Sequence, residues 1–253
     1  QAVPLKYAIN PDICLKLTKD KCGTCEEVCP ANAIDYTQKE EKVTLEAGSI
    51  IFSPGFKPFD PTLFDNYQYA NFPNVVTSME FERILSASGP TMGHVTTFPK
   101  LPLNPKKKKD KLLAEKRKDP KKIAWFQCVG SRDVEHPYCS KVCCTHSIQS
   151  AIKIKKMNPN AGVFILYRDI RTYGKREFLY KEARDLGILF FKYNKDCMPT
   201  VIPGDDYVTV EFKAHIRGKR LVVQADILCL ASRIEANDQT VLSQAFKVAS
   251  DKD

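Results

Sequence analysis

Short apolar runs alternate with stretches of helical spacing over the second half of the sequence. Apolar runs at 121–131, 162–170 and 188–195 have the length and composition of buried strands. The segments between them, 140–160 and 175–187, have helical spacing. Because strands that alternate with helices form parallel sheets, this order predicts an α/β fold with a doubly wound parallel unit.

Patterns elsewhere in the chain predict further elements. Residues 208–224 are expected to form a hairpin, and residues 225–232 a final buried strand. Residues 44–52 alternate and then become continuously apolar, which predicts a buried strand that a proline–glycine turn ends. A short helix is expected to begin at Ser78 as its N-cap.

The turn after the strand at 121–131 carries cysteines where a dinucleotide-binding unit has glycines. Parallel sheets bind ligands at the carboxyl ends of their strands, and the fingerprint G-x-G-x-x-G lies in this turn. Here the turn reads "CVGSRDVEHPYCSKVCC", and Gly130 is its one glycine. A helix beginning near Ser140 would place Cys139 and Cys143 on one face, with the positive end of its dipole toward the thiolates.

This cysteine group has the ligand number of one tetrathiolate centre. Its members are Cys128, Cys139, Cys143 and Cys144. The sequence therefore predicts a metal centre in the position of a nucleotide site. A redox-active disulfide and buried structural cysteines are the alternatives.

A second cysteine group lies near the start of the sequence. "CGTCEEVCPANAID" has the C-x2-C-x3-C-P spacing of the later part of a bacterial ferredoxin run, and seven residues separate Cys14 from Cys22 where two are usual. The predicted ligands are Cys14, Cys22, Cys25 and Cys29. The ending favours an iron–sulfur cluster, with zinc or no metal as alternatives. In two-cluster ferredoxins the cysteine before proline binds the other cluster, so Cys29 is also a candidate ligand of a centre completed by residues outside this chain.

Composition excludes several classes of protein. The net charge is +9, but much of the excess lies between Pro105 and Lys122, where no aromatic residues interleave with the lysines. A solvated basic insertion or a contact with an acidic partner is favoured there over nucleic-acid binding.

The sequence has neither an apolar run of transmembrane length nor a secretory signal pattern, so a cytoplasmic location is expected. Cys197 and Cys229 are expected to be core residues.

Four motifs together resemble the A subunit of heterodisulfide reductase and its relatives in sulfate reducers, a family of iron–sulfur flavoproteins. They are "KCGTCEEVCPANAID", "IIFSPGFKPFDP", "FQCVGSRD…YCSKVCCTHSIQSAI" and "YRDIRTYGK". The resemblance implies a thioredoxin-reductase-like flavoprotein with a ferredoxin module inserted in its FAD domain. It also implies a [4Fe-4S] cluster at the group that contains Cys128. In this family the flavin exchanges electron pairs, and the clusters carry single electrons to partner subunits.

The sequence departs from the family in ways that bear on the flavin. The family's FAD fingerprint and the first C-x2-C-x2-C-x3-C-P run lie upstream of the region that this chain matches, so the chain resembles a fragment, and FAD is expected in the full-length protein. Ser53, Pro54 and Gly55 match the family's turn beside FAD in part. Gln149 stands where the family often has a lysine near the flavin. With Gly130, these residues are the candidate cofactor contacts.

The segment after the strand at 162–170 is a further candidate contact region. It carries Arg168, Asp169, Arg171, Tyr173 and Lys175. Because it follows a strand end, it is interpreted either as a flavin or partner contact or as plain loop structure. His136 and His146 flank the second cysteine group and are candidates for hydrogen bonding to its ligands.

We expect five segments along the chain. They are a partial ferredoxin-like (α+β) module at 1–42, the remainder of an FAD-domain-like segment at 43–104, a basic insertion at 105–122, a Rossmann-like domain at 123–235 and a C-terminal segment at 236–253.

The function predicted from these features is electron transfer in a heterodisulfide-reductase-like complex, with two [4Fe-4S] clusters and a flavin. No residue is assigned a catalytic role, and the fragment alone is expected to be inactive. The expected partners are the other subunits of such a complex and ferredoxin or hydrogenase-type donors, with no nucleic acid and no direct membrane insertion. A structural or interaction module with a vestigial flavin site is the alternative, and a thiol–disulfide oxidoreductase that uses Cys143 or Cys139 is a third interpretation.

Overall fold

The computed structural model describes residues 8–39, 41–97, 115, 117–215 and 218–249. The chain divides into two compact units, Gln1–Phe52 and Ser53–Asp253. Most of the basic segment predicted at 105–122 lies outside the described residues, as does part of the turn between 214 and 219. The finer division into five segments stays a prediction.

The smaller unit contains two short helices, α1 (Leu15–Lys19) and α2 (Thr24–Glu27). Neither helix has a buried residue. No strand occurs among the described residues up to Phe52, so the prediction of a buried strand at 44–52 is wrong: this segment is exposed and irregular. An apolar run forms a strand only where a neighbouring strand pairs with it. No described part of the chain pairs with this segment.

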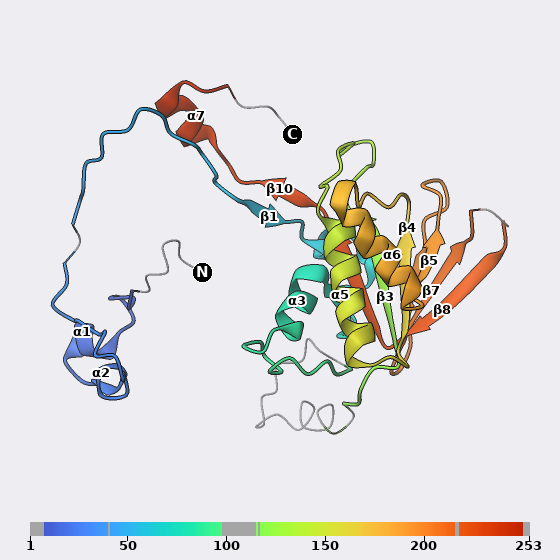
Figure 1. The fold of residues 1–253 in the computed structure, drawn as a ribbon, viewed down its shortest axis with the longest axis horizontal. Helices are drawn as coiled ribbons and strands as arrows, with labels where there is room; N and C mark the ends of the chain where they lie inside the picture. The colour runs from blue at the N-terminus through green and yellow to red at the C-terminus, as the bar shows by residue number, and fades with distance from the viewer. Residues whose placement is uncertain (1–7, 40, 98–114, 116, 216–217, 250–253) are drawn as a thin grey trace. The chain divides into compact units, whose positions relative to one another are not determined.

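The larger unit is built on a five-stranded parallel sheet of order β2-β9-β3-β4-β5 (Figure 1). Its strands are β2 (Val75–Thr77), β3 (Lys122–Val129), β4 (Gly162–Tyr167), β5 (Leu189–Lys192) and β9 (Ile227–Ser232). The predicted α/β class with a parallel sheet is confirmed. The strand predicted last in the sequence, β9, lies between β2 and β3.

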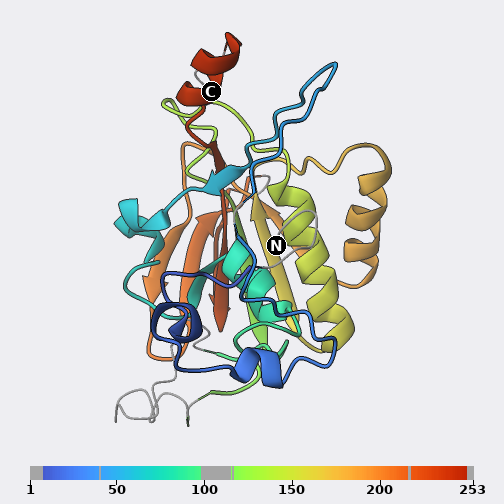
Figure 2. The same cartoon turned by 90° about the vertical axis from the view of Figure 1, so that its left-hand side faces the viewer.

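Helices cover one face of this sheet, as Figures 1 and 2 show. They are α3 (Ser78–Leu85), α5 (Cys143–Met157) and α6 (Glu177–Asp185), the last preceded by the 3-10 turn η3 (Gly174–Arg176). Trp125 of β3 points to this face, where its ring meets that of Phe81 edge-on at a centroid distance of 5.3 Å. This face holds one of the two hydrophobic cores.

A second, antiparallel sheet covers the opposite face. It consists of β6 (Thr200–Pro203), β7 (Val208–Lys213) and β8 (Arg220–Ala225), and the predicted hairpin is the β7–β8 pair. Phe126, the neighbour of Trp125 on β3, points to this side and meets Tyr193 and Tyr67 edge-on. Because β3 is buried on both faces, its apolar run is nearly continuous.

Two further features complete the larger unit. Strands β1 (Phe56–Pro58) and β10 (Ile234–Ala236) pair in an antiparallel ribbon. After β1 the chain forms two 3-10 turns, η1 (Pro61–Leu63) and η2 (Asp65–Tyr67). After β10 it forms the helix α7 (Thr240–Phe246). At α3 the N-cap is Thr77 and not Ser78, because Thr77 and Glu80 form a reciprocal capping box.

Candidate metal centres

The larger unit places four cysteines around the carboxyl end of β3 and the first turn of α5. Cys128 lies one residue before the end of β3, and Cys143 and Cys144 open α5; all three are buried. Cys139 is half-buried in the loop between these elements.

The helix α5 begins at Cys143, and the prediction of a start near Ser140 is wrong. Ser140 is held outside the helix because its hydroxyl accepts a hydrogen bond from the backbone N–H of Ile234 on β10 (3.0 Å). Lys141 has φ +62°, a left-handed conformation that an α-helix cannot contain. Cys139 therefore approaches the group from the loop and does not share a helical face with Cys143.

The four thiols lie within electrostatic reach of one another. The pKa of the Cys143 thiol is raised strongly, first by its hydrogen bond to Cys144, then by burial, and further by the charges of Cys144, Cys128 and Cys139. The pKa of Cys144 is lowered to about 6, chiefly because the Cys143 thiol donates to it, with help from the backbone and charge of Arg171. The hydrogen bond between the two sulfurs therefore favours the thiolate form of Cys144 over that of Cys143.

Arginines surround this thiol group. Burial raises the pKa of Cys128, and the charge of Cys144 raises it further, while Arg132 and Arg168 lower it. Arg132 donates to Asp169 (Nη2 to Oδ2, 2.6 Å), and the Cys144 sulfur lies 3.6 Å from the backbone oxygen of Asp169. A positive environment of this kind stabilises anionic sulfur.

The thiols are not drawn together around a single ion: among the described residues, no group of three or more His, Cys, Asp or Glu side chains is placed to hold one metal ion. A [4Fe-4S] cubane needs a wider arrangement, because each of its four thiolates binds a different iron. The buried Nη1 of Arg132 also lacks a hydrogen-bond partner of ordinary geometry. Four free thiols and an unpaired guanidinium nitrogen fit an anionic cluster at this position.

The loop that leaves β3 has an unusual backbone. Cys128, Gly130 and Arg132 have φ of +62°, +68° and +59°. Two buried or half-buried arginines hold this loop from outside it. Arg233 donates through Nη1 to the Gly130 oxygen, and Arg168 donates to the oxygens of Ser131 (3.3 Å) and Arg132 (2.8 Å). Left-handed conformations at residues other than glycine are unfavourable, so these contacts stabilise the loop.

Gly130 fits only as glycine. Besides its left-handed φ, a Cβ at this position would lie 2.8 Å from the Phe59 ring. We expect Gly130→Ala to lower the free energy of unfolding by about 2–4 kcal/mol, the sum of a left-handed alanine and a forced overlap. Urea denaturation followed by fluorescence measures this loss.

Gly187→Ala is the matched control for that variant. Gly187 also has a left-handed φ (+78°), but nothing lies within 4 Å of its added Cβ. Gly187→Ala should lower the free energy of unfolding by only about 1 kcal/mol, because the left-handed backbone conformation is the single unfavourable effect there. Equal losses in the two variants would show that the Phe59 contact does not restrict position 130.

The smaller unit holds the other cysteine group. The Cys29 sulfur accepts the backbone N–H of Ala33 (3.4 Å), and this donor and the N–H groups of Ala31 and Asn32 lower the pKa of Cys29. The backbone and hydroxyl of Thr24 lower the pKa of Cys22. Backbone N–H groups aimed at sulfur are also how a protein holds an iron–sulfur cluster.

Tyr36 lies beside this group. Burial raises the pKa of its hydroxyl most, and the charges of Cys25, Cys14 and Cys22 raise it further. The three cysteines are therefore near one phenol. Within the smaller unit Cys14, Cys22 and Cys25 are thus gathered in one region, although no three of the described His, Cys, Asp or Glu side chains form a single-ion site.

The lowered pKa values predict thiol reactivity in iron-free protein. At pH 7 we expect Cys22 and Cys29 to react with iodoacetamide faster in the folded chain than in urea, because a larger fraction of each is thiolate. The advantage should disappear above about pH 9, where the unfolded thiols are also ionised. Peptide mass spectrometry at timed quenches gives the rates. Equal rates at pH 7 in both states would contradict the N–H···S contacts.

The candidate flavin residues are dispersed. Ser53, Pro54 and Gly55 are exposed before β1, where the Pro54 oxygen accepts from the Asn237 side chain (2.8 Å). Gln149 is exposed on α5. Gly130 lines a cavity of about 510 Å³, and neither Gln149 nor residues 53–55 line it. Their role in flavin binding stays a prediction.

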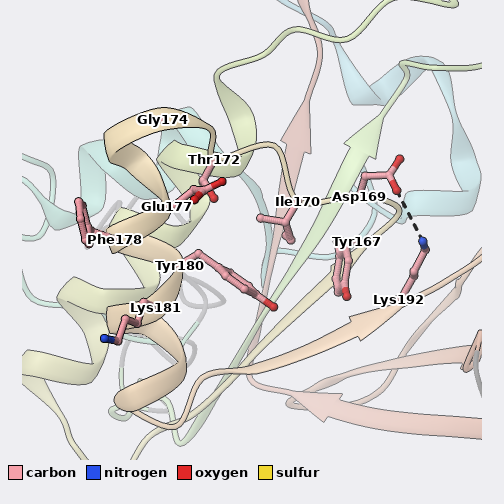
Figure 3. Close-up of a pocket in the computed structure, with 10 residues that line it drawn as sticks. All are labelled: Tyr167, Asp169, Ile170, Thr172, Gly174, Glu177, Phe178, Tyr180, Lys181 and Lys192. Atoms are coloured by element: carbon pink, nitrogen blue, oxygen red, sulfur yellow. Dashed lines mark ion pairs between the residues drawn. The ribbon is translucent and has the colours of Figure 1, made fainter.

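Two cavities lie at the carboxyl edge of the sheet. The cavity at Gly130 is lined also by Cys128, Arg132, Arg168 and Tyr67. The other, of about 620 Å³, lies between α6 and the ends of β4 and β5 (Figure 3). Asp169 lines the second cavity and there forms an ion pair with Lys192 (3.6 Å).

The loop after β4 thus contacts both cavities. Arg168 lines the first and Asp169 the second, while Arg171 touches the thiol group through Cys144. Tyr173 and Lys175 are exposed.

The sequence predicts two histidines that hydrogen-bond to cysteine ligands and two further cysteines that lie in the core. His146 pairs with Glu82 (3.1 Å) and His136 with Asp133 (3.4 Å), so neither histidine is seen bonded to a cysteine. Cys229 is fully buried in the core as expected, whereas Cys197 is exposed.

The chain matches a known family in one short motif, and it matches several longer proteins over nearly all of its sequence. Residues 20–35 match the family described as 4Fe-4S binding domain, a range that contains three of the four cysteines of the smaller unit. The iron-sulfur A subunit of CoB–CoM heterodisulfide reductase from Methanocaldococcus jannaschii is 34% identical over 92% of this chain and 33% of its own length. The A subunit of H(2)/formate:CoB-CoM heterodisulfide,ferredoxin reductase from Methanococcus maripaludis is 36% identical over 93% and 33%. The heterodisulfide reductase A-subunit-like protein of Archaeoglobus profundus is 35% identical over 95% and 37%.

Among solved structures, the L-lysine 6-monooxygenase of Pseudomonas syringae matches with a TM-score of 0.41 and 13% identity, over 79% of this chain and 49% of that one. This likeness is too low to support a comparison of sites.

A parallel α/β unit together with a 4Fe-4S binding motif defines the class of the chain: an α/β protein that carries an iron–sulfur motif. The chain is homologous to the A subunit of heterodisulfide reductase over nearly its whole length, which confirms the resemblance inferred from its motifs. It spans 33 to 37% of the length of these relatives.

Proposed function

We propose that the chain is the electron-transfer segment of a heterodisulfide-reductase-like complex and binds two [4Fe-4S] clusters. The ligands of one are Cys14, Cys22, Cys25 and Cys29, and those of the other are Cys128, Cys139, Cys143 and Cys144. The observation that carries the proposal is the second group: four thiols converge among arginines at the sheet edge where such folds bind ligands.

When bound, each cluster supplies a one-electron redox centre. The protein supplies the surroundings. At the second group, burial of Cys128, Cys143 and Cys144 excludes water, and the arginines offset the negative charge of the thiolates. At the first group, backbone N–H groups donate to the sulfurs and lower their pKa. The two groups belong to separate compact units of the chain.

The proposal extends to flavin and partners in the full-length protein. Ser53, Pro54, Gly55, Gly130 and Gln149 are the proposed flavin contacts of this segment. The relatives' names describe ferredoxin- and H2-linked heterodisulfide reductases, which supports other subunits of such a complex and ferredoxin or hydrogenase-type donors as partners. None of the helices in the described part of the chain has the length and apolarity required to cross a membrane. A cytoplasmic location is proposed.

The test is the iron and acid-labile sulfide content of anaerobically purified protein. Two cubanes correspond to about eight of each per chain, with a reducible visible band and low-potential EPR signals. A colourless, zinc-loaded protein would instead indicate a structural module.

The Cys143–Cys144 pair favours one other function, thiol–disulfide exchange, because it holds a thiolate beside a thiol. Alkylation of Cys144 that abolishes activity without releasing iron would support it.

A further inference from the structure

One arginine connects the loop after β3 to the loop after β4 beside the second cysteine group. The Arg132 side chain is 18% exposed and donates to Asp169 (2.6 Å). It lines the cavity of about 510 Å³ together with Cys128. The Cys144 sulfur lies 3.6 Å from the backbone oxygen of the same Asp169. Two of the four thiols therefore lie beside this arginine or its partner.

The guanidinium is held in place from several directions. Arg168 donates to the backbone oxygen of Arg132 itself (2.8 Å), which fixes the left-handed backbone from which the side chain extends. Asp169 in turn faces Lys192 (Oδ1 to Nζ, 3.6 Å), as Figure 3 shows. Arg132 is thus a positioned charge and not a freely rotating surface cation.

The two terminal nitrogens of the Arg132 guanidinium have different surroundings. Nη2 donates to Asp169, and Nη1 is buried without a hydrogen-bond partner of ordinary geometry. The guanidinium also lies close enough to the Cys128 sulfur for its charge and a hydrogen bond to lower the pKa of that thiol, which burial raises. Burying an unpaired charged donor is unfavourable, so its position calls for an acceptor. An anionic sulfur of a bound cluster has the required chemistry.

We infer that Arg132 sets the reduction potential of the cluster bound at Cys128, Cys139, Cys143 and Cys144, and that Asp169 is its positioning residue. This inference rests on the proposed function. Reduction adds one electron, taken from a one-electron donor that is thereby oxidised, and makes the site more negative by one charge. A fixed positive charge nearby stabilises the reduced form more than the oxidised form and so raises the potential. Arg132 stays protonated, so no proton is transferred.

The experiment is a potentiometric EPR titration of the full chain with both clusters bound. In Arg132→Gln, we expect the reduced-to-oxidised ratio of the second centre, measured at the wild-type midpoint, to fall about tenfold, or ~59 mV for a one-electron couple. Arg132→Lys should restore most of this shift because it keeps the charge. The centre in the smaller unit should not move in either variant, and it serves as an internal reference.

Two further variants separate charge from structure. Arg220→Gln removes a charge from the exposed, Glu211-paired arginine of β8 and should leave both midpoints unchanged. Asp169→Asn keeps the guanidinium and a hydrogen-bond acceptor for it but removes a negative charge, so the midpoint of the second centre should rise. This variant tests the inference even if Arg132→Gln fails to retain the cluster.

The outcomes distinguish the role of Arg132 from the presence of the cluster. Two EPR signals with an unmoved midpoint in Arg132→Gln, a shift of equal size in Arg132→Lys, or a midpoint that does not rise in Asp169→Asn would overturn the role of Arg132 alone. A wild-type chain that binds iron and sulfide but shows no centre dependent on Cys144 would overturn the proposed second cluster, and this inference with it.

Discussion

Replacing Cys144 with serine is expected to lower the iron content from about eight atoms per chain to about four. A serine hydroxyl ionises far less readily than a thiol and is a poor ligand for iron in a cubane. Cys144 is the member of the second group whose pKa is lowered, to about 6, so its thiolate is available for binding at neutral pH. The measurements are iron and acid-labile sulfide per chain, with EPR of the reduced protein.

Cys25→Ser is the complementary variant, because Cys25 belongs to the other compact unit. It should remove the other half of the iron and leave the EPR signal that Cys144→Ser abolishes. Cys197→Ser is the matched control: this cysteine is exposed and lies outside both groups, so iron content should not change. Full iron content in Cys144→Ser, or the loss of all iron in either single variant, would contradict two independent centres.

The parallel core could be predicted because its signals are local. In the series β3, α5, β4, α6 and β5, each element is a complete apolar run or helical stretch, and short connections make neighbours in sequence neighbours in space. The place of β9 could not be predicted. It pairs with β3 across a separation of about a hundred residues, and no local pattern specifies such pairing. Likewise, the apolar run at 44–52 has strand composition, but composition does not supply a pairing neighbour.

In the candidate site, too, features with a local sequence signal could be predicted and features that depend on contacts between distant residues could not. Cysteine spacing identifies all eight proposed ligands, because a tetrathiolate centre needs closely spaced thiols. The pattern misplaces the start of α5 because Ser140 is held by Ile234, a contact between residues far apart in the sequence. It also finds the surrounding arginines only in part. Arg168 stands out as a residue after a strand end, but Arg132 and Arg233 do not.

Arg233 carries a signal that sequence reasoning could have used. It follows directly after the buried strand predicted at 225–232, and residues after parallel strands meet at one edge of the sheet. Its backbone N–H in fact donates to the oxygen of Val129, at the end of β3 (2.9 Å). The same rule that locates Cys128 therefore also locates Arg233.

Replacing Arg233 with alanine is expected to lower the free energy of unfolding by about 3–5 kcal/mol, the typical effect of breaking a buried ion pair. Arg233 is 6% exposed, pairs with Glu235 (2.7 Å) and lies over the Phe59 ring at 4.3 Å. It also donates to the Gly130 oxygen, in the loop that follows Cys128. We therefore expect less iron at the second centre as well, measured beside urea denaturation.

Two comparisons show whether the shape of the guanidinium or only its charge matters. Arg233→Lys keeps the charge but cannot contact Glu235 and Gly130 at once, so it should recover only part of the stability. Arg220→Ala, on the exposed β8 arginine, should change stability by less than about 1 kcal/mol. If Arg233→Lys matches the wild type in both stability and iron content, the charge alone is sufficient. If Arg233→Ala instead keeps wild-type stability, the ion pair between Arg233 and Glu235 does not stabilise the loop that follows Cys128.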